Sequence, residues 1–274
     1  LDHYGSLEKL EDTFVAFANK VPFYGLCVLC LDHPNVQRIL PRIEKRTLTY
    51  GLSAQADLRA TDVRAEGLKV SFDVSRQGEK LGRVTLGMPG AHNVLNCLAA
   101  LALADELQVD FDVAAQALES FEGVARRFTI VGEASDVTII DDYGHHPAEI
   151  MATLEAAQDA FDRRVVAVFQ PHRYSRTQML RQEFERAFNR ADVLIVVPIY
   201  AAGEPTIEGV SSEELAQGIR DHGHRSVFYE DSLDAAVNRL EGIIRPGDVV
   251  VTLGAGNVNR VGREMLERLG GEKE

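Results

Sequence analysis

The sequence predicts an α/β protein whose C-terminal half is a parallel, doubly wound sheet. Beyond Gly123, short apolar runs of strand length alternate strictly with longer stretches of helix length. Such alternation is typical of a parallel sheet with helices packed on it. Before Gly123, several short strand-like runs are followed by two helices, which indicates a separate region. A length of 274 residues suits two domains, which we place at 1–125 and 126–274.

The N-terminal region begins with an amphipathic helix at 6–20, where Ser6 is placed to act as the N-cap. The apolar run 25–31 follows and predicts a buried strand. Pro34 then marks the opening of a short helix. Glycine turns at hairpin-like spacing separate the next runs, and an Ala/Leu-rich helix pair ends the region. The remaining elements expected here are strands at 47–50, 58–63, 68–74 and 83–86 and helices at 90–106 and 111–118.

The C-terminal region alternates strand and helix throughout. Its expected strands lie at 137–141, 165–169, 193–197, 226–229 and 249–253. Its expected helices lie at 148–161, 176–189, 212–220, 232–240 and 258–269. In an open sheet of this kind, ligands bind outside the carboxyl ends of the strands. The turns that follow the strands are therefore where we expect the chemistry.

Composition excludes several classes of protein. The chain has 29 Lys and Arg against 42 Asp and Glu, and a net charge of −13 disfavours non-specific binding to nucleic acid or to an anionic membrane. No apolar run approaches the roughly 18 residues of a membrane span. Three cysteines do not make a disulfide framework, which fits a reducing compartment. We expect a cytoplasmic protein that binds neither nucleic acid nor membrane.

The densest group of ionisable side chains follows the strand expected at 137–141. The turn reads Asp141-Asp142-Tyr143-Gly144-His145-His146-Pro147. Carboxylates and imidazoles in a strand-to-helix turn can perform acid–base chemistry. Two other interpretations stay open at this point. An Asp could simply cap the following helix, or the carboxylates and histidines could hold the metal of a phosphohydrolase.

The next strand ends in a basic turn. It reads Gln170-Pro171-His172-Arg173-Tyr174-Ser175-Arg176-Thr177. Arg173 and Arg176 fall within the turn itself, and guanidinium groups bind carboxylates and phosphates through two parallel hydrogen bonds. The basic residues farther along suit a solvated helix face: Arg181, Arg186 and Arg190. We therefore predict an anion site at the turn.

Two further places bear on function without deciding it. His92, Asn93 and Asn96 open the long Ala-rich helix, where amides can read a purine edge or merely cap the helix. Arg126 and Arg127 stand where the two regions meet, and domain interfaces are common ligand sites. A charged hinge is the alternative interpretation of that pair.

Four strings occur in order along the chain. They are Gly90-Ala91-His92-Asn93-x-x-Asn96, Gly123-Val124-Ala125-Arg126-Arg127-Phe128, the turn from Asp141 to Pro147, and the segment from Phe169 to Thr177. Together they resemble the Mur ligases, and the resemblance runs over essentially the whole chain. Several long strings in the right order are far more specific than any one of them.

The resemblance implies part of a three-domain enzyme. The family has a UDP-sugar domain, a central ATPase domain and a C-terminal Rossmann-like domain for the incoming amino acid. Residues 1–125 would be the C-terminal half of the central domain, and 126–274 would be the complete C-terminal domain. The sequence has no G-x-x-x-x-G-K-[ST] phosphate loop, and it begins at Leu1 without methionine. We therefore expect that the chain starts within a domain and is inactive by itself.

The resemblance is greatest to the Mur ligase that joins L-alanine to the lactyl carboxylate of UDP-N-acetylmuramate, in peptidoglycan precursor synthesis. It implies that ATP, with Mg²⁺, phosphorylates the carboxylate and that the alanine amine attacks the resulting acyl phosphate. Cations at the developing negative charge would matter most in such a reaction. The alternative within the family is the ligase that recycles a ready-made tripeptide onto the same UDP-sugar.

The resemblance also implies a nucleotide side and an amino-acid side. The nucleotide side would consist of His92, Asn93, Asn96, Arg127, Asp142 and Tyr143. Within it, Asn93 and Asn96 would contact the adenine, Arg127 the phosphates and Asp142 the ribose. The amino-acid side would consist of His145, His172, Arg173 and Arg176, with the two arginines holding the alanine carboxylate. The catalytic candidates are Arg127, Asp142 and His145, and whether either histidine acts as a base stays open.

Overall fold

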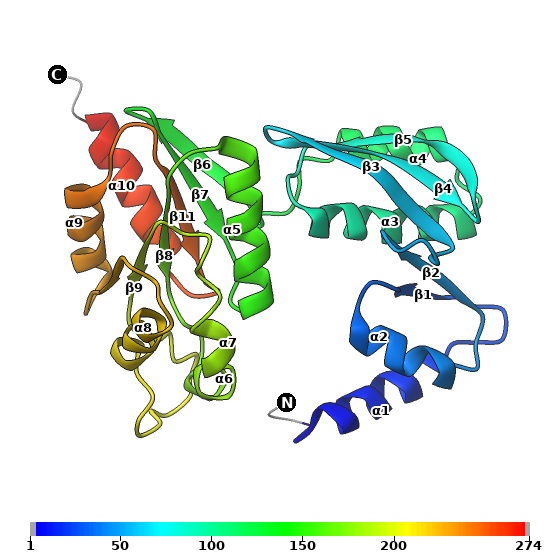
Figure 1. Cartoon of the computed structure of the whole chain (residues 1–274), viewed down its shortest axis with the longest axis horizontal. Helices are drawn as coiled ribbons and strands as arrows, with labels where there is room; N and C mark the ends of the chain where they lie inside the picture. The colour runs from blue at the N-terminus through cyan, green and yellow to red at the C-terminus, as the bar shows by residue number, and fades with distance from the viewer. Residues whose placement is uncertain (1–3, 272–274) are drawn as a thin grey trace. The chain divides into compact units, whose positions relative to one another are not determined.

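The computed structural model describes residues 4–271, so Leu1, where we expect the chain to start within a domain, lies outside the described residues. The backbone divides into two compact units, Leu1–Glu122 and Gly123–Glu274 (Figure 1). The boundary that we predict between 125 and 126 lies close to this division. Among the described residues, no helix has the length and apolar character needed to cross a membrane.

The N-terminal unit contains the helices and strands that the sequence predicts, with one short 3-10 helix in addition. They are α1 (Leu7–Ala18), β1 (Cys27–Cys30), α2 (Pro34–Ile39), η1 (Leu40–Arg42), β2 (Thr47–Gly51), β3 (Leu58–Glu66), β4 (Lys69–Arg76), β5 (Glu79–Leu86), α3 (Ala91–Glu106) and α4 (Phe111–Glu119). As predicted, Ser6 caps α1: its hydroxyl accepts the amide hydrogen of Lys9 at 3.2 Å.

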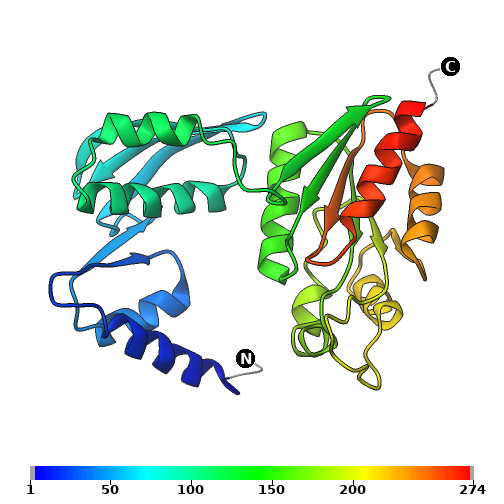
Figure 2. The same ribbon diagram turned by 180° about the vertical axis from the view of Figure 1, so that it is seen from behind.

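The sheet of this unit has the order β1-β2-β3-β4-β5, parallel among the first three strands and antiparallel among the last three. Helices α3 and α4 lie side by side against it, as Figure 2 shows from behind. The buried core between the layers includes Phe72 and Leu86 from the sheet and Val94 and Leu98 from α3. This packing fixes the first turn of α3, where we place the adenine contacts.

The C-terminal unit alternates strands and helices. Its elements are β6 (Thr129–Ala134), β7 (Val137–Asp142), α5 (Pro147–Phe161), β8 (Val165–Phe169), α6 (Tyr174–Met179), α7 (Arg181–Phe184), β9 (Val193–Val196), α8 (Ser212–Asp221), β10 (Val227–Tyr229), α9 (Leu233–Ile243), β11 (Val249–Leu253) and α10 (Asn259–Gly271). The strand order is β10-β9-β8-β11-β7-β6, and all pairs except β6–β7 are parallel.

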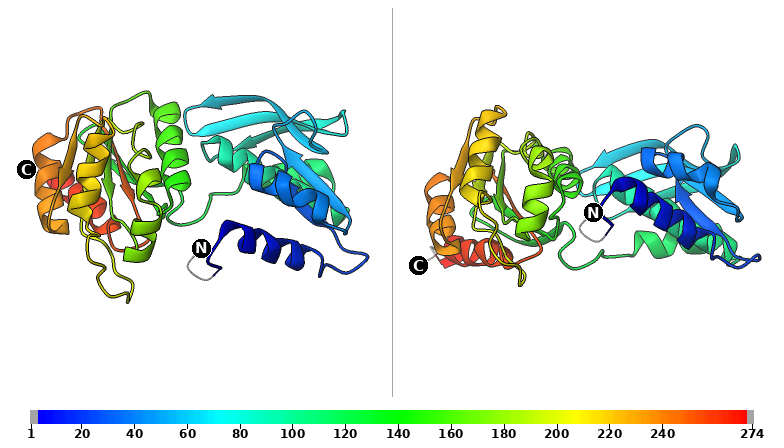
Figure 3. Two further views of the ribbon diagram at one scale, coloured as in Figure 1. Left: turned by 60° about the horizontal axis from the view of Figure 1, so that its bottom comes forward. Right: turned by 90° about the horizontal axis from the view of Figure 1, so that it is seen from below.

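Helices cover both faces of this sheet, which makes it doubly wound as predicted (Figures 1 and 3). On one face, α5, α7 and α8 bury side chains such as Leu154, Phe184 and Leu215. On the other, α9 and α10 bury Val237 and Met265. The central strands β8 and β11 are apolar except for Thr252, because both of their faces are buried.

Two features differ from the prediction. Strand β6 is an antiparallel edge strand that the sequence analysis does not expect, because its side chains are half exposed and a bulge between Ile130 and Gly132 breaks its alternation. The helix expected at 176–189 is two short helices, α6 and α7. They are separated at Leu180, whose φ of −107° and ψ of 22° depart from helical values.

Candidate functional site

The turns that carry the predicted residues meet at one edge of the C-terminal sheet. Strand β11 lies between β7 and β8, and its last residue, Leu253, is in register with Asp142 on one side and Phe169 on the other. Because the three strands are parallel, the turns that follow them leave the sheet at the same edge. A fourth segment joins them after β9, where Tyr200 pairs with His172 in an isolated parallel bridge.

Four aromatic rings form a row across these turns. Tyr143 and His145 meet edge to face with 5.5 Å between ring centroids, and His145 lies 5.8 Å from His172. His172 in turn stacks on Tyr200 at 5.6 Å with 15° between the ring planes. The structure thus brings together the two histidines that the sequence analysis singles out. We call His145, His172, Arg173, Arg176 and Tyr200 the strand-end cluster.

The His172 ring is held by Arg176. One guanidinium nitrogen of Arg176 lies 3.2 Å from His172 Nδ1 and 3.3 Å from the His172 carbonyl oxygen. A guanidinium can only donate, so Nδ1 accepts and the ring proton lies on Nε2. Burial, together with the charges of Arg176, His145 and Arg173, lowers the pKa of His172. His172 is therefore a neutral ring that offers an N–H donor at Nε2.

His145 has the opposite arrangement of donor and acceptor. Its Nδ1 lies 3.0 Å from the carbonyl oxygen of Tyr143, which can only accept a hydrogen bond. In the neutral ring the proton therefore lies on Nδ1, and Nε2 carries the lone pair. Of the two histidines, His145 has the tautomer that a general base needs.

Arg173 lies at the start of α6 in an unusual backbone conformation, with φ at +73°. Its amide donates to the carbonyl of Tyr200 at 2.9 Å. Its own carbonyl accepts from the amide and the hydroxyl of Thr177, at 3.2 and 2.8 Å. These bonds fix the backbone, while the side chain is 43% exposed and lies 3.7 Å from the Glu204 carboxylate. Arg173 can therefore meet an incoming anion.

The two carboxylates at the end of β7 have different partners. Asp141 forms an ion pair with Arg126 at 3.0 Å and accepts from the Thr252 hydroxyl at 2.8 Å. Asp142 accepts the amide hydrogens of Phe128 at 2.8 Å and of Gly144 at 2.6 Å. Burial raises the pKa of the Asp142 carboxyl, and these two amides together with Arg127 oppose the rise.

The metal interpretation of this turn does not hold for the described residues. In 4–271 no three side chains of His, Cys, Asp or Glu come together in a way that could hold a metal ion. A side chain of this turn does cap the following helix, but it belongs to a histidine and not to an aspartate. His146 caps α5 through Nδ1, and Glu149 closes a capping box by accepting the amide hydrogens of His145 and His146 at 3.0 and 3.1 Å.

Arg127 lies beside two residues that follow β7, Tyr143 and Glu149. Its guanidinium is 5.7 Å from the centroid of the Tyr143 ring, and one nitrogen lies 3.5 Å from a Glu149 oxygen. The side chain is 48% exposed, so it remains available to an anion. Arg126 differs, because all three of its nitrogens are engaged within the C-terminal unit. Arg126 therefore has a structural role, whereas Arg127 is available to bind an anion.

The predicted adenine contacts lie in the N-terminal unit, in the first turn of α3. The Asn93 amide donates to the carbonyl of Pro89 at 2.8 Å, so it holds the helix entrance. Gly90, the N-cap, has φ at +99° and offers no side-chain cap. Asn96 is exposed, and its amide nitrogen lies 3.5 Å from the Asn93 side-chain oxygen. His92 is half-buried beside them.

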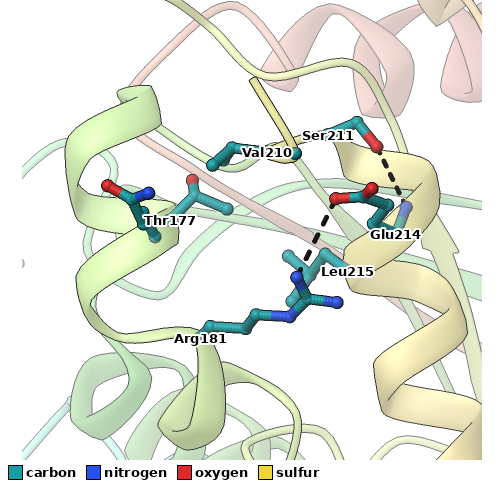
Figure 4. Close-up of a pocket in the computed structure, with 8 residues that line it drawn as sticks. Thr177, Arg181, Val210, Ser211, Glu214 and Leu215 are labelled. Carbon is teal, nitrogen blue, oxygen red and sulfur yellow. Dashed lines mark hydrogen bonds and ion pairs between the residues drawn. The ribbon is translucent and has the colours of Figure 1, made fainter. Parts of the chain in front are cut away.

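A pocket of about 120 Å³ lies between α6, α7 and α8 (Figure 4). Arg181 reaches across it towards Glu214 at 3.8 Å and is also paired with Glu185 at 2.9 Å. None of the predicted site residues lines it. Because its one cation is matched by two carboxylates, it lacks the free positive charge of the strand-end cluster.

Three residues that shape the cluster were not predicted from the sequence: Glu149, Tyr200 and Glu204. Tyr200 and Glu204 follow β9, and their place just beyond a strand end is a signal that could have found them. Glu149 stands at the third position of α5, which is the capping-box position for an acidic residue.

Two protein families described at the level of domains match the chain. Residues 1–104 match the family described as "Mur ligase middle domain". Residues 126–256 match the family described as "Mur ligase, glutamate ligase domain". The chain belongs to the Mur ligase family. The resemblance stated from the four sequence strings is thereby confirmed.

Proteins named UDP-N-acetylmuramate–L-alanine ligase are similar to this Mur ligase over almost its whole length. The one from Sorangium cellulosum is 59% identical over 273 residues, which are 98% of this chain and 58% of that protein. The one from Geobacter sp. (strain M21) is 54% identical over 275 residues, which are 100% of this chain and 60% of that protein. The chain therefore spans about three fifths of the length of these relatives.

Solved structures of Mur ligases have the same fold. UDP-N-acetylmuramate–alanine ligase from Thermotoga maritima matches with a TM-score of 0.75 and 26% identity, over 96% of this chain and 55% of that one. The MurF ligase from Thermotoga maritima in complex with ADP matches with a TM-score of 0.75 and 22% identity, over 97% of this chain and 58% of that one. The predicted α/β fold of a Mur ligase is confirmed.

Proposed function

We propose that this Mur ligase chain takes part in the ATP-dependent ligation of L-alanine to the lactyl carboxylate of UDP-N-acetylmuramate. The observation that carries the proposal is the strand-end cluster, in which Arg173 and Arg176 lie beside His145 and His172 at the carboxyl edge of the sheet. The names of relatives at 54% and 59% identity support the choice of L-alanine. Residues 1–125 would be part of the central ATPase domain, and 126–274 would be the amino-acid domain.

The cluster suits a free amino acid because such a substrate carries one anionic and one cationic group. Arg173 would bind the alanine carboxylate, and a hydrogen bond to a charged group contributes about 1.5–3 kcal/mol. Arg176 would add a second positive charge and hold the His172 ring. The Nε2 lone pair of His145 would accept a proton from the alanine ammonium group, which must become a neutral amine before it attacks the acyl phosphate.

His172 would act differently, as a donor. Its Nε2–H would hydrogen-bond an anionic oxygen of the substrate or of the tetrahedral intermediate, where preorganised donors stabilise developing charge. In this scheme the ammonium group gives one proton to His145, and the neutral amine then forms the C–N bond of the tetrahedral intermediate. When the C–O bond to phosphate breaks, the second nitrogen proton leaves with the phosphate, which yields the amide. The neutral ring of His172 and the lone pair on His145 thus have separate tasks.

On the nucleotide side, we propose that His92, Asn93 and Asn96 lie at the adenine of ATP. Arg127 would approach the phosphates, and Asp142 with Tyr143 the ribose. Each Asp142 oxygen accepts one amide hydrogen and has a second lone pair for a ribose hydroxyl. The ADP complex of a solved relative supports nucleotide binding in proteins of this fold.

Mg²⁺ enters the proposal as the companion of the ATP phosphates. Magnesium is usually held by substrate phosphate oxygens, water and one or two carboxylates. Since the described residues assemble no metal cluster, no step above depends on a metal held by this chain alone. We also propose that the reaction takes place in the cytoplasm, which agrees with three free cysteines.

The test uses the full-length protein that contains this chain, with ATP, Mg²⁺, UDP-N-acetylmuramate and L-alanine. We expect one ADP and one phosphate per UDP-N-acetylmuramoyl-L-alanine, identified by mass, and little ADP release when either acceptor is omitted. The chain of 274 residues by itself should show no turnover, since it has no phosphate loop. Product formation with a ready-made tripeptide but not with L-alanine would overturn the proposal in favour of the recycling ligase.

A further inference from the structure

Glu204 connects two parts of the strand-end cluster that are far apart in sequence. It follows β9 by way of a tight turn in which Ala202 and Gly203 both have positive φ, at 50° and 86°. The Glu204 amide donates to the carbonyl of Ala201 at 3.0 Å, which closes the turn. The turn delivers the carboxylate to the first turn of α6.

Both oxygens of Glu204 are held there by Ser175. The Ser175 hydroxyl donates to Oε1 at 2.7 Å and the Ser175 amide donates to Oε2 at 3.1 Å. Burial alone would raise the pKa of the Glu204 carboxyl, but the Ser175 hydrogen bonds and the charge of Arg173 lower it overall. The carboxylate is thus ionised, and the two Ser175 hydrogen bonds hold its oxygens in place.

Arg173 meets this fixed charge with one edge of its guanidinium. Its Nε lies 3.7 Å from Glu204 Oε1, an ion pair that is longer than a hydrogen bond. The pair engages the Nε side of the group. It leaves the two terminal nitrogens, which can bind a carboxylate through two parallel hydrogen bonds, for another partner. Among the described residues, neither of those two nitrogens donates a hydrogen bond to another group of the protein.

We propose that Glu204 is a positioning residue, which holds the Nε edge of Arg173 so that the terminal nitrogens receive the carboxylate of the incoming amino acid. This inference rests on the proposed function and adds to it a residue that does not touch the substrate. The fixed carboxylate opposes the rotation of an exposed, flexible arginine side chain, so that less of its conformational freedom is lost when the amino acid binds.

The experiment compares Glu204→Gln with Glu208→Gln in the full-length protein. The amide introduced by Glu204→Gln can still accept a hydrogen bond from Ser175 but carries no charge, and Glu208 is an exposed residue of the same loop. We expect Glu204→Gln to raise the KM for L-alanine about tenfold, with the KM for ATP and kcat each within about twofold of wild type. Glu208→Gln should leave all three unchanged.

A second measurement does not depend on the reaction. In the chain of 274 residues, the Nε–H resonance of Arg173 is assigned by its loss in Arg173→Lys. We expect 15N relaxation of this Nε to report a restrained side chain in wild type and in Glu208→Gln, and a mobile one in Glu204→Gln. Unchanged relaxation in Glu204→Gln would overturn the proposal even if the ligase reaction itself proved wrong.

The kinetic outcomes are equally decisive. An alanine KM in Glu204→Gln equal to that of wild type would show that Arg173 needs no such support. A lower alanine KM would show that Glu204 competes with the substrate carboxylate. Either result overturns the proposal. If the wild-type protein forms no product from L-alanine, the proposed function fails, and the relaxation measurement alone decides the role of Glu204.

Discussion

Arg126 and Asp141 form an ion pair at the end of β7, with 3.0 Å between Nε and Oδ2. The Asp141 side chain is 5% exposed and that of Arg126 is 26% exposed. The terminal nitrogens of Arg126 donate to the carbonyls of Gly254 and Gly256, at 2.7 and 3.2 Å. Arg126 therefore joins the segment before β6 to the end of β7 and to the turn after β11, which is one of the turns at the site.

Arg126→Ala should lower the free energy of unfolding of the C-terminal unit by about 3 kcal/mol, because it leaves the Asp141 carboxylate buried without its cation. Arg127→Ala is the matched control. The exposed contact of Arg127 with Glu149 at 3.5 Å should contribute no more than about 1 kcal/mol. Urea unfolding of the chain measures both. Equal losses in the two variants would contradict the division into a structural and an available arginine.

The pH dependence of stability follows from three histidines that the fold makes harder to protonate. Partial desolvation lowers the pKa values of His146, His172 and His224. Below about pH 6.5 the unfolded chain therefore binds protons that the folded chain does not, and the free energy of unfolding falls as the pH falls. His172→Gln should reduce this slope between about pH 7 and 5.5, by urea unfolding at each pH. A slope that is unchanged in the variant would show that His172 titrates normally.

Gly256 lies where no side chain fits. A Cβ at this position would meet the side-chain oxygen of Gln170 and would come within 2.8 Å of Cγ of the Tyr200 ring. Gly256→Ala should therefore destabilise the C-terminal unit by about 1–3 kcal/mol and displace Tyr200 from His172. Gly242→Ala is the control, since a Cβ there meets nothing within 4 Å and α9 should gain up to about 1 kcal/mol. Equal thermal unfolding of the two variants would refute this.

We expect Asn93 of α3 to contribute to stability and Asn96 to contribute to ATP binding. Asn93→Ala removes the bond to the Pro89 carbonyl and should cost the N-terminal unit about 1 kcal/mol. Asn96→Ala, at an exposed position, should leave stability within about 0.5 kcal/mol but raise the KM for ATP in the full-length protein. Unfolding curves and ATP titrations test the pair. An unchanged ATP KM in Asn96→Ala would remove that residue from the proposed adenine contacts.

Much of the fold follows from local patterns in the sequence. The buried strands β8 and β11 are apolar runs, interrupted only by Thr252, so the parallel sheet could be predicted from them. Strand β6 could not, because it is a half-exposed edge with a bulge, where Gly132 makes room for Leu266. Its existence depends on pairing with β7, which no local pattern contains.

Several residues of the candidate site could be predicted from the sequence, but their contacts could not. Position at a strand end was enough to single out His145, His172 and Arg173, because parallel strands bring their following turns together. The partners of these side chains could not be predicted. Glu204 reaches the first turn of α6 only through the turn after β9. One of the two bonds of Asp142 depends on the backbone of Phe128, whose φ is +49°. Such contacts arise from loop conformation rather than residue type.

The most direct test is the alanine dependence of Arg173→Ala in the full-length protein. Arg186→Ala is a control of equal charge change, at an exposed position in the turns after α7. Loss of a charged hydrogen bond worth about 1.5–3 kcal/mol should raise the KM for L-alanine by roughly 10- to 100-fold. The KM for ATP should change by less than about twofold, and Arg186→Ala should resemble wild type. An unchanged alanine KM in Arg173→Ala would show that the amino-acid carboxylate is bound elsewhere.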